Sequence, residues 1–112
     1  MAKLEYRLDG AFDVILREVE EGILHGSVSA SLEDKSDFCS GTVRCAVRVF
    51  ERYSMAGGNR LSMTVTLFDS PEGMFLSAIT AGGSNARFIK INTFGENSFL
   101  RCIEEIVERF RV

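Results

Sequence analysis

The sequence has one histidine, three cysteines and no long apolar run, and each shortage excludes a class of protein. With one histidine and no C-x-x-C pair, a zinc site of the usual cysteine and histidine spacing lacks its ligands. The three cysteines are an odd and sparse set, which we interpret as reduced thiols serving as small apolar residues. The first ten residues contain no apolar stretch typical of a signal peptide, and no segment is long enough to cross a bilayer. We therefore expect a cytoplasmic protein with no membrane partner.

An excess of positive charge is also missing, since the net charge of the 112 residues is −3. Non-specific nucleic-acid binding depends on a positive field, so the sequence gives no strong nucleic-acid signal. The 46% apolar and 26% charged residues are ordinary for a globular protein. A chain of this length buries roughly two-thirds of its unfolded surface, enough to fold without help. We expect one α+β domain over residues 1–112, with no metal and no cofactor.

Two segments carry apolar residues at helical spacing, and most of the remainder alternates apolar and polar residues as half-buried strands do. Clusters of glycine, asparagine and proline mark the turns between them. The expected elements are a strand at 3–8, a helix at 12–24, a strand at 27–32, a polar connector at 33–37, strands at 42–53 and 60–68 joined by the turn AGGN, strand segments at 74–80 and 86–92, and a helix at 93–110. We predict a hairpin for 74–92, and one bulged strand is the alternative.

Capping residues indicate where the two helices begin and end. Asp9 is the expected N-cap of the first helix, and Gly26 is its expected terminator. Thr93 and Glu96 fit a T-x-x-E capping box at the start of the second helix.

Every strand with clear alternation has one apolar face, so both amphipathic helices should cover that face. The fold class is therefore a two-layer α+β domain in the order strand, helix, four or five antiparallel strands, helix, with both helices on one sheet face. In the strand at 42–53 we expect the valines and Cys45 to face the core. The predicted core consists of Leu4, Tyr6, Ile15, Leu16, Val19, Val47, Val65, Ile103, Ile106 and Phe110.

The stretch SAITAGGSNARFIKINTFGENSF sets two glycines ahead of basic residues, as a phosphate-binding loop would. A dinucleotide fingerprint needs its glycines between a strand and a helix, and a Walker A loop ends in Gly-Lys-Ser/Thr. Neither condition is met, so we interpret Gly82 and Gly83 as part of a turn. The alternative is a small nest of loop amides that binds an anion beside Arg87.

Arg44, Arg48 and Arg52 recur every four residues and so share one face of the strand at 42–53. We predict that this face points away from the helices, beside Thr64 and Thr66. There the arginines would form a basic platform for a small anionic ligand or an acidic partner. The alternative is a solvated face with cross-strand ion pairs.

Phe50 and Phe68 are expected on the same outward face. Two aromatic residues on an otherwise wet face indicate burial against another molecule. Two-fold homodimers are the commonest oligomers, so we expect a second copy of the chain there.

No arrangement of residues identifies catalytic chemistry. The lone histidine, His25, follows the first helix, where it complements the helix dipole. We therefore interpret the chain as a binding or interaction domain that self-associates through the outer sheet face, rather than as an enzyme. The alternatives are a domain that binds an anionic small molecule and a small enzyme with a dispersed site that uses Cys45 or Cys102.

Several segments together resemble a family of short, uncharacterised bacterial proteins. They are RLDG, GSVSAS, VRVFERYSMAGGNR, MFLSAIT, AGGSN and KINTFGE. The resemblance covers nearly the whole chain, from Tyr6 to the final helix. It implies a bacterial and cytoplasmic origin, and it carries over no catalytic or binding residue.

The predicted order of elements is also similar to that of TATA-binding-protein repeats, and less closely to that of helix-grip domains. These are analogies of architecture and imply no function. The first kind of protein uses its open sheet face, whereas the second encloses a pocket between the sheet and the last helix.

Overall fold

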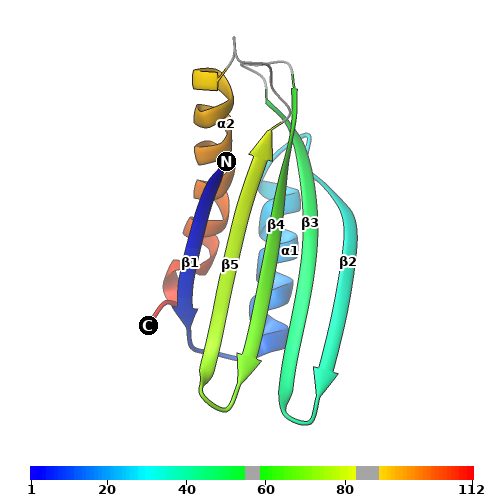
Figure 1. Cartoon of the computed structure of the whole chain (residues 1–112), viewed down its shortest axis with the longest axis vertical. Helices are drawn as coiled ribbons and strands as arrows, with labels where there is room; N and C mark the ends of the chain where they lie inside the picture. The colour runs from blue at the N-terminus through cyan, green and yellow to red at the C-terminus, as the bar shows by residue number, and fades with distance from the viewer. Residues whose placement is uncertain (55–58, 83–88) are drawn as a thin grey trace.

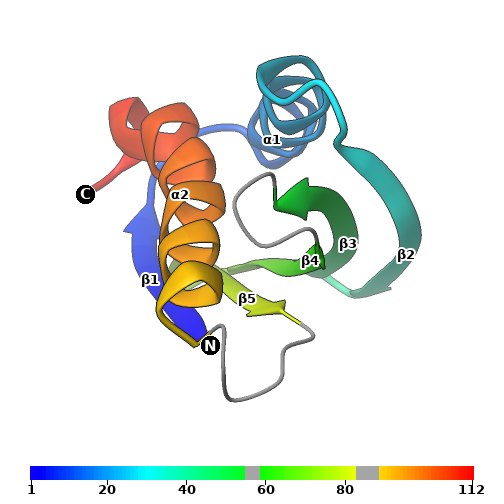
Figure 2. The same ribbon diagram turned by 90° about the horizontal axis from the view of Figure 1, so that it is seen from above.

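The computed structural model describes residues 1–54, 59–82 and 89–112. The elements are β1 (Ala2–Leu8), α1 (Phe12–Gly26), β2 (Ser31–Ser40), β3 (Val43–Ser54), β4 (Asn59–Ser70), β5 (Gly73–Gly82), α2 (Ile89–Val107) and the 3-10 helix η2 (Glu108–Phe110). The strands form one antiparallel sheet in the order β1-β5-β4-β3-β2. Both helices lie on the same side of this sheet (Figures 1 and 2). The predicted two-layer α+β fold is confirmed.

The core lies between the helices and the sheet. Its largest fully buried side chains are Phe50, Phe99, Ile15, Ile23, Leu61, Met63, Leu67, Leu76, Ile103, Val19, Val65 and Val107. Of the predicted core, Leu4, Ile15, Val19, Val65 and Ile103 are buried, while Tyr6, Leu16, Ile106 and Phe110 pack against that core half-buried. Val47 was predicted wrongly, because it lies on the opposite face of the sheet from the buried Ala46 and Arg48.

The faces of β3 are the reverse of the prediction. Directly opposite residues of an antiparallel pair share a face, and the register sets Arg48 opposite Val65 and Phe50 opposite Met63. Val65 and Met63 are buried under the helices, so Arg48 and Phe50 point to the helices as well. The valines of β3 and Cys45 consequently point outward.

The prediction of a connector at 33–37 was also wrong, because these residues belong to β2. The strand predicted at 27–32 is correct for residues 31 and 32, where β2 begins. β2 is an edge strand with one neighbour, and its residues from Glu33 to Ser40 are all exposed. Charged side chains are common on edge strands, where they discourage pairing with other chains. The β2–β3 hairpin closes at Gly41, whose φ of 58° favours glycine.

The first helix begins without the predicted cap. Ala11 is the N-cap residue, and no side chain caps the helix there. Asp9 lies before the helix, and its backbone N–H donates to the carbonyl oxygen of Phe110 at 2.8 Å. The same C-terminal residues run along the edge of β1, where the N–H of Val112 donates to the carbonyl oxygen of Arg7 at 2.9 Å.

The second helix begins earlier than predicted. It starts at Ile89, so Thr93 and Glu96 lie inside α2 and form no capping box at its start. The predicted strand at 86–92 is wrong for residues 89–92, and the predicted hairpin is wrong because β1 and β4 already flank β5. Most of the predicted AGGN turn lies outside the described residues. Among the residues that the structure describes, no helix is long and apolar enough to cross a membrane.

The two helices pack closely at Gly22 of α1. A methyl group at Gly22 would lie 2.5 Å from Cδ1 and 2.8 Å from Cγ1 of Ile106 in α2. Gly22 therefore makes room for Ile106. The other glycine of α1 is Gly26, where an added methyl group would have no neighbour within 4 Å.

We expect Gly22→Ala to lower the free energy of unfolding by roughly 1 kcal/mol, because the clash with Ile106 outweighs the better helix propensity of alanine. In an Ile106→Ala background the clash is gone, so the same substitution should raise stability by up to about 1 kcal/mol. Urea denaturation of the four proteins measures the double-mutant cycle. Gly26→Ala is the matched control and should cause no loss. A Gly22→Ala cost that persists without the Ile106 side chain would contradict this account.

Candidate functional site

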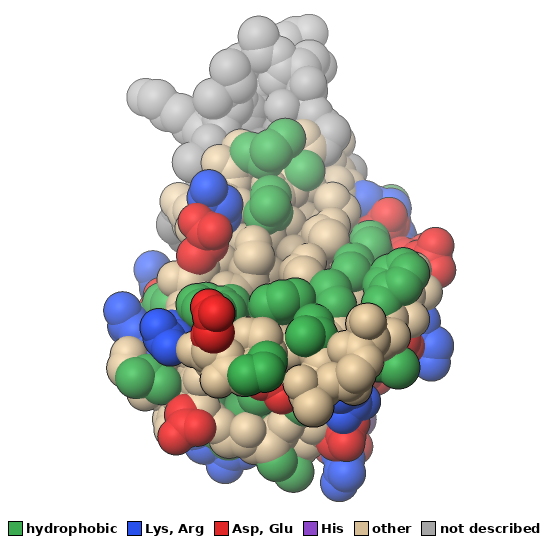
Figure 3. Space-filling view, turned by 60° about the horizontal axis from the view of Figure 1, so that its bottom comes forward, with side chains coloured by type: hydrophobic (Ala, Val, Ile, Leu, Met, Phe, Trp, Pro, Cys, Tyr) green, Lys and Arg blue, Asp and Glu red, His purple; other side chains and the backbone are tan. Residues whose placement is uncertain are grey.

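None of the described elements covers the side of the sheet opposite the helices, which we call the outer face (Figure 2). The strand registers place on it Lys3, Glu5 and Arg7 of β1, Phe75, Ser77 and Ile79 of β5, Thr64, Thr66 and Phe68 of β4, Cys45, Val47, Val49 and Tyr53 of β3, and Asp34, Ser36 and Phe38 of β2. Hydrophobic side chains gather in a band on this face (Figure 3). A surface of this composition is typical of an interaction site.

One row of directly paired residues crosses all five strands. This row, the aromatic row, consists of Phe38, Cys45, Phe68, Phe75 and Arg7. Its three phenylalanines are 65%, 37% and 42% exposed in that order. Cross-strand neighbours lie roughly 5 Å apart at Cβ, so their side chains form one continuous apolar strip.

Another row of paired residues, closer to the opposite end of the sheet, carries charge at both ends. It consists of Asp34, Val49, Thr64, Ile79 and Lys3. The carboxylate lies at the β2 edge and the ammonium group at the β1 edge. This row thus has opposite charges at its two ends, and Glu5 lies beside Lys3 on β1, with its Oε1 3.4 Å from Lys3 Nζ.

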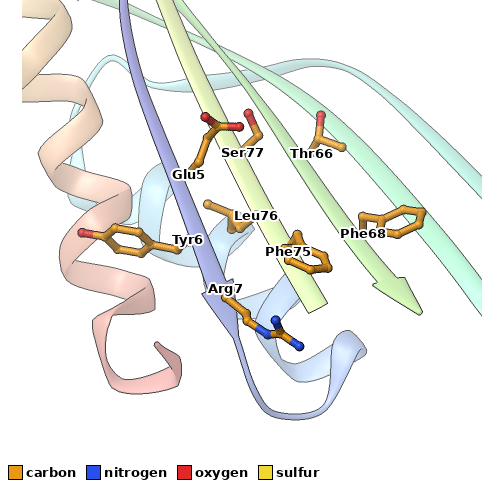
Figure 4. Close-up of a pocket in the computed structure, with 8 residues that line it drawn as sticks. All are labelled: Glu5, Tyr6, Arg7, Thr66, Phe68, Phe75, Leu76 and Ser77. Atoms are coloured by element: carbon orange, nitrogen blue, oxygen red, sulfur yellow. The ribbon is translucent and has the colours of Figure 1, made fainter. Parts of the chain in front are cut away.

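A depression of about 320 Å³ lies on the outer face over β1, β5 and β4 (Figure 4). The phenyl rings of Phe68 and Phe75 lie beside each other in it. The rest of the lining comes from Glu5, Tyr6, Arg7, Thr66, Leu76 and Ser77. The rings make one part of the depression apolar, and the hydroxyl and carboxylate groups make another part polar.

Arg7 borders this depression and is fixed by the β4–β5 turn. Its guanidinium lies 5.3 Å from the centroid of the Phe75 ring and donates to the carbonyl oxygen of Glu72 at 2.6 Å. Gly73 leaves space for it, because a methyl group there would lie 2.8 Å from the guanidinium. Gly73 also has a φ of 140°, which side chains rarely allow.

The predicted basic platform on the outer face is wrong. Arg48 points to the helices and is 4% exposed, with its Nε 3.1 Å from Glu20 Oε1 of α1 and its Nη2 2.9 Å from Asp37 Oδ1 of β2. Burial lowers the pKa of the Arg48 guanidinium, but the hydrogen bonds from Arg48 to Asp37 and Glu20 outweigh it, so the pKa is raised. The guanidinium keeps its charge and joins the sheet to α1.

Arg44 and Arg52 are engaged on the same helix-facing side. Arg44 donates to Asp13 Oδ1 at 2.9 Å and lies 4.2 Å from the centroid of the Phe12 ring. The hydrogen bond from Arg44 lowers the pKa of Asp13. Arg52 donates to Ser98 Oγ of α2 at 3.1 Å. The three arginines therefore connect β3 to both helices.

The other predicted site residues fall into three groups. Phe50 was placed wrongly on the outer face, because it is fully buried in the core. Phe68, Thr64 and Thr66 lie on the outer face as predicted. Gly82 is the last residue of β5, whereas Gly83 and Arg87 lie outside the described residues.

The sequence prediction missed Phe38, Phe75 and Ile79, which are among the exposed apolar side chains of the outer face. A signal was present in β5, where Phe75 and Ile79 alternate with the buried Met74, Leu76 and Ala78. Apolar residues on both faces of a strand are typical of sheets that are covered on both sides.

A second depression, near α2, is lined by Tyr6, Glu104, Glu105, Glu108 and Arg111. The Tyr6 hydroxyl donates to Glu104 Oε2 at 2.9 Å, and the Arg111 guanidinium lies 4.1 Å from the centroid of the Tyr6 ring. Burial raises the pKa of Tyr6, and so do the hydrogen bond and the charge of Glu104. Within the described residues, no three histidine, cysteine or carboxylate side chains come together as they would to hold a metal ion.

A family model described as "Family of unknown function (DUF6054)" matches residues 1–111. This match confirms the resemblance to a family of unknown function, while the bacterial and cytoplasmic origin stays a prediction. No curated protein matches the chain. The description names no activity, so the candidate site depends on the geometry of the outer face.

We expect Arg48→Ala to lower the free energy of unfolding by about 2–3 kcal/mol, because it removes hydrogen bonds to two carboxylates and the packing of a buried stem. The loss should stay below that of a fully buried pair, since solvent reaches Glu20 and Asp37, which are 29% and 58% exposed. Arg44→Ala is the control, and its more exposed side chain predicts a smaller loss. Thermal and urea denaturation measure both, and equal losses would refute the structural role of Arg48.

We expect Tyr6 to titrate above the ordinary tyrosine pKa of about 10. Its pKa is raised in the fold, so the contact stabilises the protein fully below pH ~10 and loses its effect as pH rises through the folded-state pKa. Tyr53→Phe leaves Tyr6 as the one tyrosine whose absorbance reports ionisation. Glu104→Gln in that background should lower the pKa of Tyr6, because it removes the negative charge beside the hydroxyl. A Tyr6 pKa at or below the ordinary value would contradict the described contact.

Proposed function

The chain belongs to the DUF6054 family, a family of unknown function, and from that premise we propose that it is a small interaction domain whose outer face binds a second copy of the chain. The observation that carries the proposal is the aromatic row. Phe38, Phe68 and Phe75 stand partly exposed on a sheet face that no described element covers. Burying the exposed part of each ring contributes roughly 1 kcal/mol.

The size of the outer face supports a stable contact between two copies. Five strands spaced about 4.8 Å apart, with about ten residues each at 3.3 Å per residue, give a face of roughly 800 Å². Standard protein interfaces bury about this area on each partner. Phe68 and Phe75 of the aromatic row lie on inner strands, and Phe38 lies on the edge strand β2. Lys3, Glu5, Arg7 and Asp34 lie on the two edge strands, so most of the charge is at the rim, as it is in the usual interface.

The charges of the outer face support a second copy as the partner. Lys3, Glu5 and Arg7 lie on β1, where Lys3 Nζ is 3.4 Å from Glu5 Oε1, and Asp34 lies on β2, so the face carries both signs of charge. A further pair on this face, Arg60 and Glu51, is joined at 2.8 Å within the chain. A face that is balanced in this way can complement itself under two-fold symmetry, whereas a strongly charged partner would need one dominant sign.

The alternative of an anionic ligand depended on free guanidinium groups on the outer face. Arg44 and Arg48 are bound to carboxylates on the helix side, and Arg52 is bound to Ser98 there. The geometry of the described residues therefore favours self-association over that alternative.

We expect the wild-type chain to have twice its monomer mass in sedimentation equilibrium and light scattering, with a concentration-dependent monomer fraction. Phe68→Asp should give the monomer, because it buries a charge in the apolar centre of the contact. High salt should not dissociate the dimer, since the centre of the contact is apolar.

Val14→Asp is the matched control, because Val14 is a similarly exposed apolar residue on α1. It should leave the mass unchanged. A wild-type chain that stays monomeric at every accessible concentration would refute the proposal, and so would an equal effect of both substitutions.

A further inference from the structure

The outer face carries a protruding ring and a depression on opposite sides of its central strand. Phe38 on β2 is 65% exposed, more than any other aromatic side chain among the described residues. The depression lies over β1, β5 and β4, toward the opposite edge of the sheet. Phe38, Phe68, Phe75 and Arg7 belong to the same aromatic row, so the ring and the depression stand at the same height along the strands.

β4 is the middle of the five strands, and β2 and β1 each lie two strands from it, at roughly 10 Å. A two-fold axis that runs parallel to β4, just above its outer face, therefore lays β2 of one copy on β1 of the other. Because the axis is parallel to the strands, each row of one copy faces the same row of the other. We propose that the two copies associate about this axis, so that Phe38 of each copy inserts into the depression of the other. This geometry rests on the self-association proposed above and specifies it.

The same axis brings complementary groups together at both edges. Asp34 and Lys3 end one row, so Lys3 of each copy, which already lies 3.4 Å from Glu5 Oε1 of its own chain, also meets the partner's Asp34. Arg7 ends the aromatic row at the rim of the depression, so its guanidinium meets the ring of the partner's Phe38. Cations stabilise aromatic rings in such positions. Each contact occurs twice, as an isologous interface requires.

The other simple arrangement has its two-fold axis across the strands. It would lay β1 on the partner's β1, which brings Lys3 and Arg7 of both copies together and makes the cations repel. It would also lay β2 on the partner's β2, which leaves both depressions without a ring. The charges and the shape of the outer face thus select the axis along β4.

Chemical cross-linking tests the axis directly in a chain whose three cysteines are replaced by alanine and whose dimer mass is verified first. Thr66 lies on β4 beside the axis, so Thr66→Cys should be cross-linked to its copy by a bis-maleimide spanning the ~10 Å between packed sheets. Ser36→Cys and Glu5→Cys lie at opposite ends of one row. Each alone should give no cross-linked dimer, whereas a mixture of the two proteins should.

The outcomes separate this inference from the proposed function. A verified dimer in which Ser36→Cys or Glu5→Cys cross-links with itself, while the mixture does not, overturns the axis along β4 and leaves self-association standing. A verified dimer that none of these sites cross-links overturns the axis too, because the contact then uses another face. A chain that is monomeric throughout overturns both.

Charge exchange and truncation give an independent measurement. Lys3→Asp and Asp34→Lys should each raise the dimer dissociation constant, and the double variant should restore it, since the pair is re-formed with reversed signs. Phe38→Ala should raise the dissociation constant about tenfold, as loss of an aromatic side chain that fills a pocket of its partner does. Thermal stability of the monomer should not change with Phe38→Ala, because the ring is exposed within one chain. A double variant as weak as the single ones would contradict the proposed contact.

Discussion

The pairing of β3 with β4 is the constraint on which the rest of the structure depends. β4 carries Leu61, Met63, Val65 and Leu67 on one face, and these residues have to lie under the helices. Antiparallel partners share a face, so the register then decides which side of β3 is buried. It turns Phe50 and the arginines inward and the valines outward.

This orientation brings charged groups into the layer between the sheet and the helices. A buried guanidinium is costly unless it is hydrogen-bonded and paired. The chain meets that need for Arg48 from two sides, with Glu20 on α1 and Asp37 on the edge strand β2. The polar residues of β2 thus have a structural task beyond shielding an edge, because one of them holds the arginine that faces α1.

The same constraint leaves apolar side chains on the outer face. With the valines of β3 facing outward beside Phe68 and Phe75, the sheet is apolar on both sides, and one side is covered by helices. Covering the second face of such a sheet is stabilising, because it removes apolar side chains from water. The contact with a second copy proposed above would cover it.

Most of the local structure could be predicted from the sequence, with β2 and the start of α2 as the exceptions. Alternation of apolar and polar residues predicted β1, β4 and most of β5, helical spacing predicted α1 and the end of α2, and the common apolar face predicted both helices on one side. These features depend on neighbours along the chain, so they can be predicted without the fold. The apolar run at the start of α2 was compatible with a strand or a helix, and the space beside β5, taken by β1, excluded the strand.

Two features depend on the tertiary structure: which face of a strand is buried, and where each strand lies in the sheet. β3 has apolar residues on both faces, so its own pattern could not say whether Val47 or Arg48 is buried, and the register with β4 decided it. β2 is polar because it lies at the edge, a position that no local pattern reveals. The candidate site also depends on strand pairing. Phe38 is far from Phe68 and Phe75 in the sequence, and the three become one surface because the pairings of β2 with β3, β3 with β4 and β4 with β5 align them in one row.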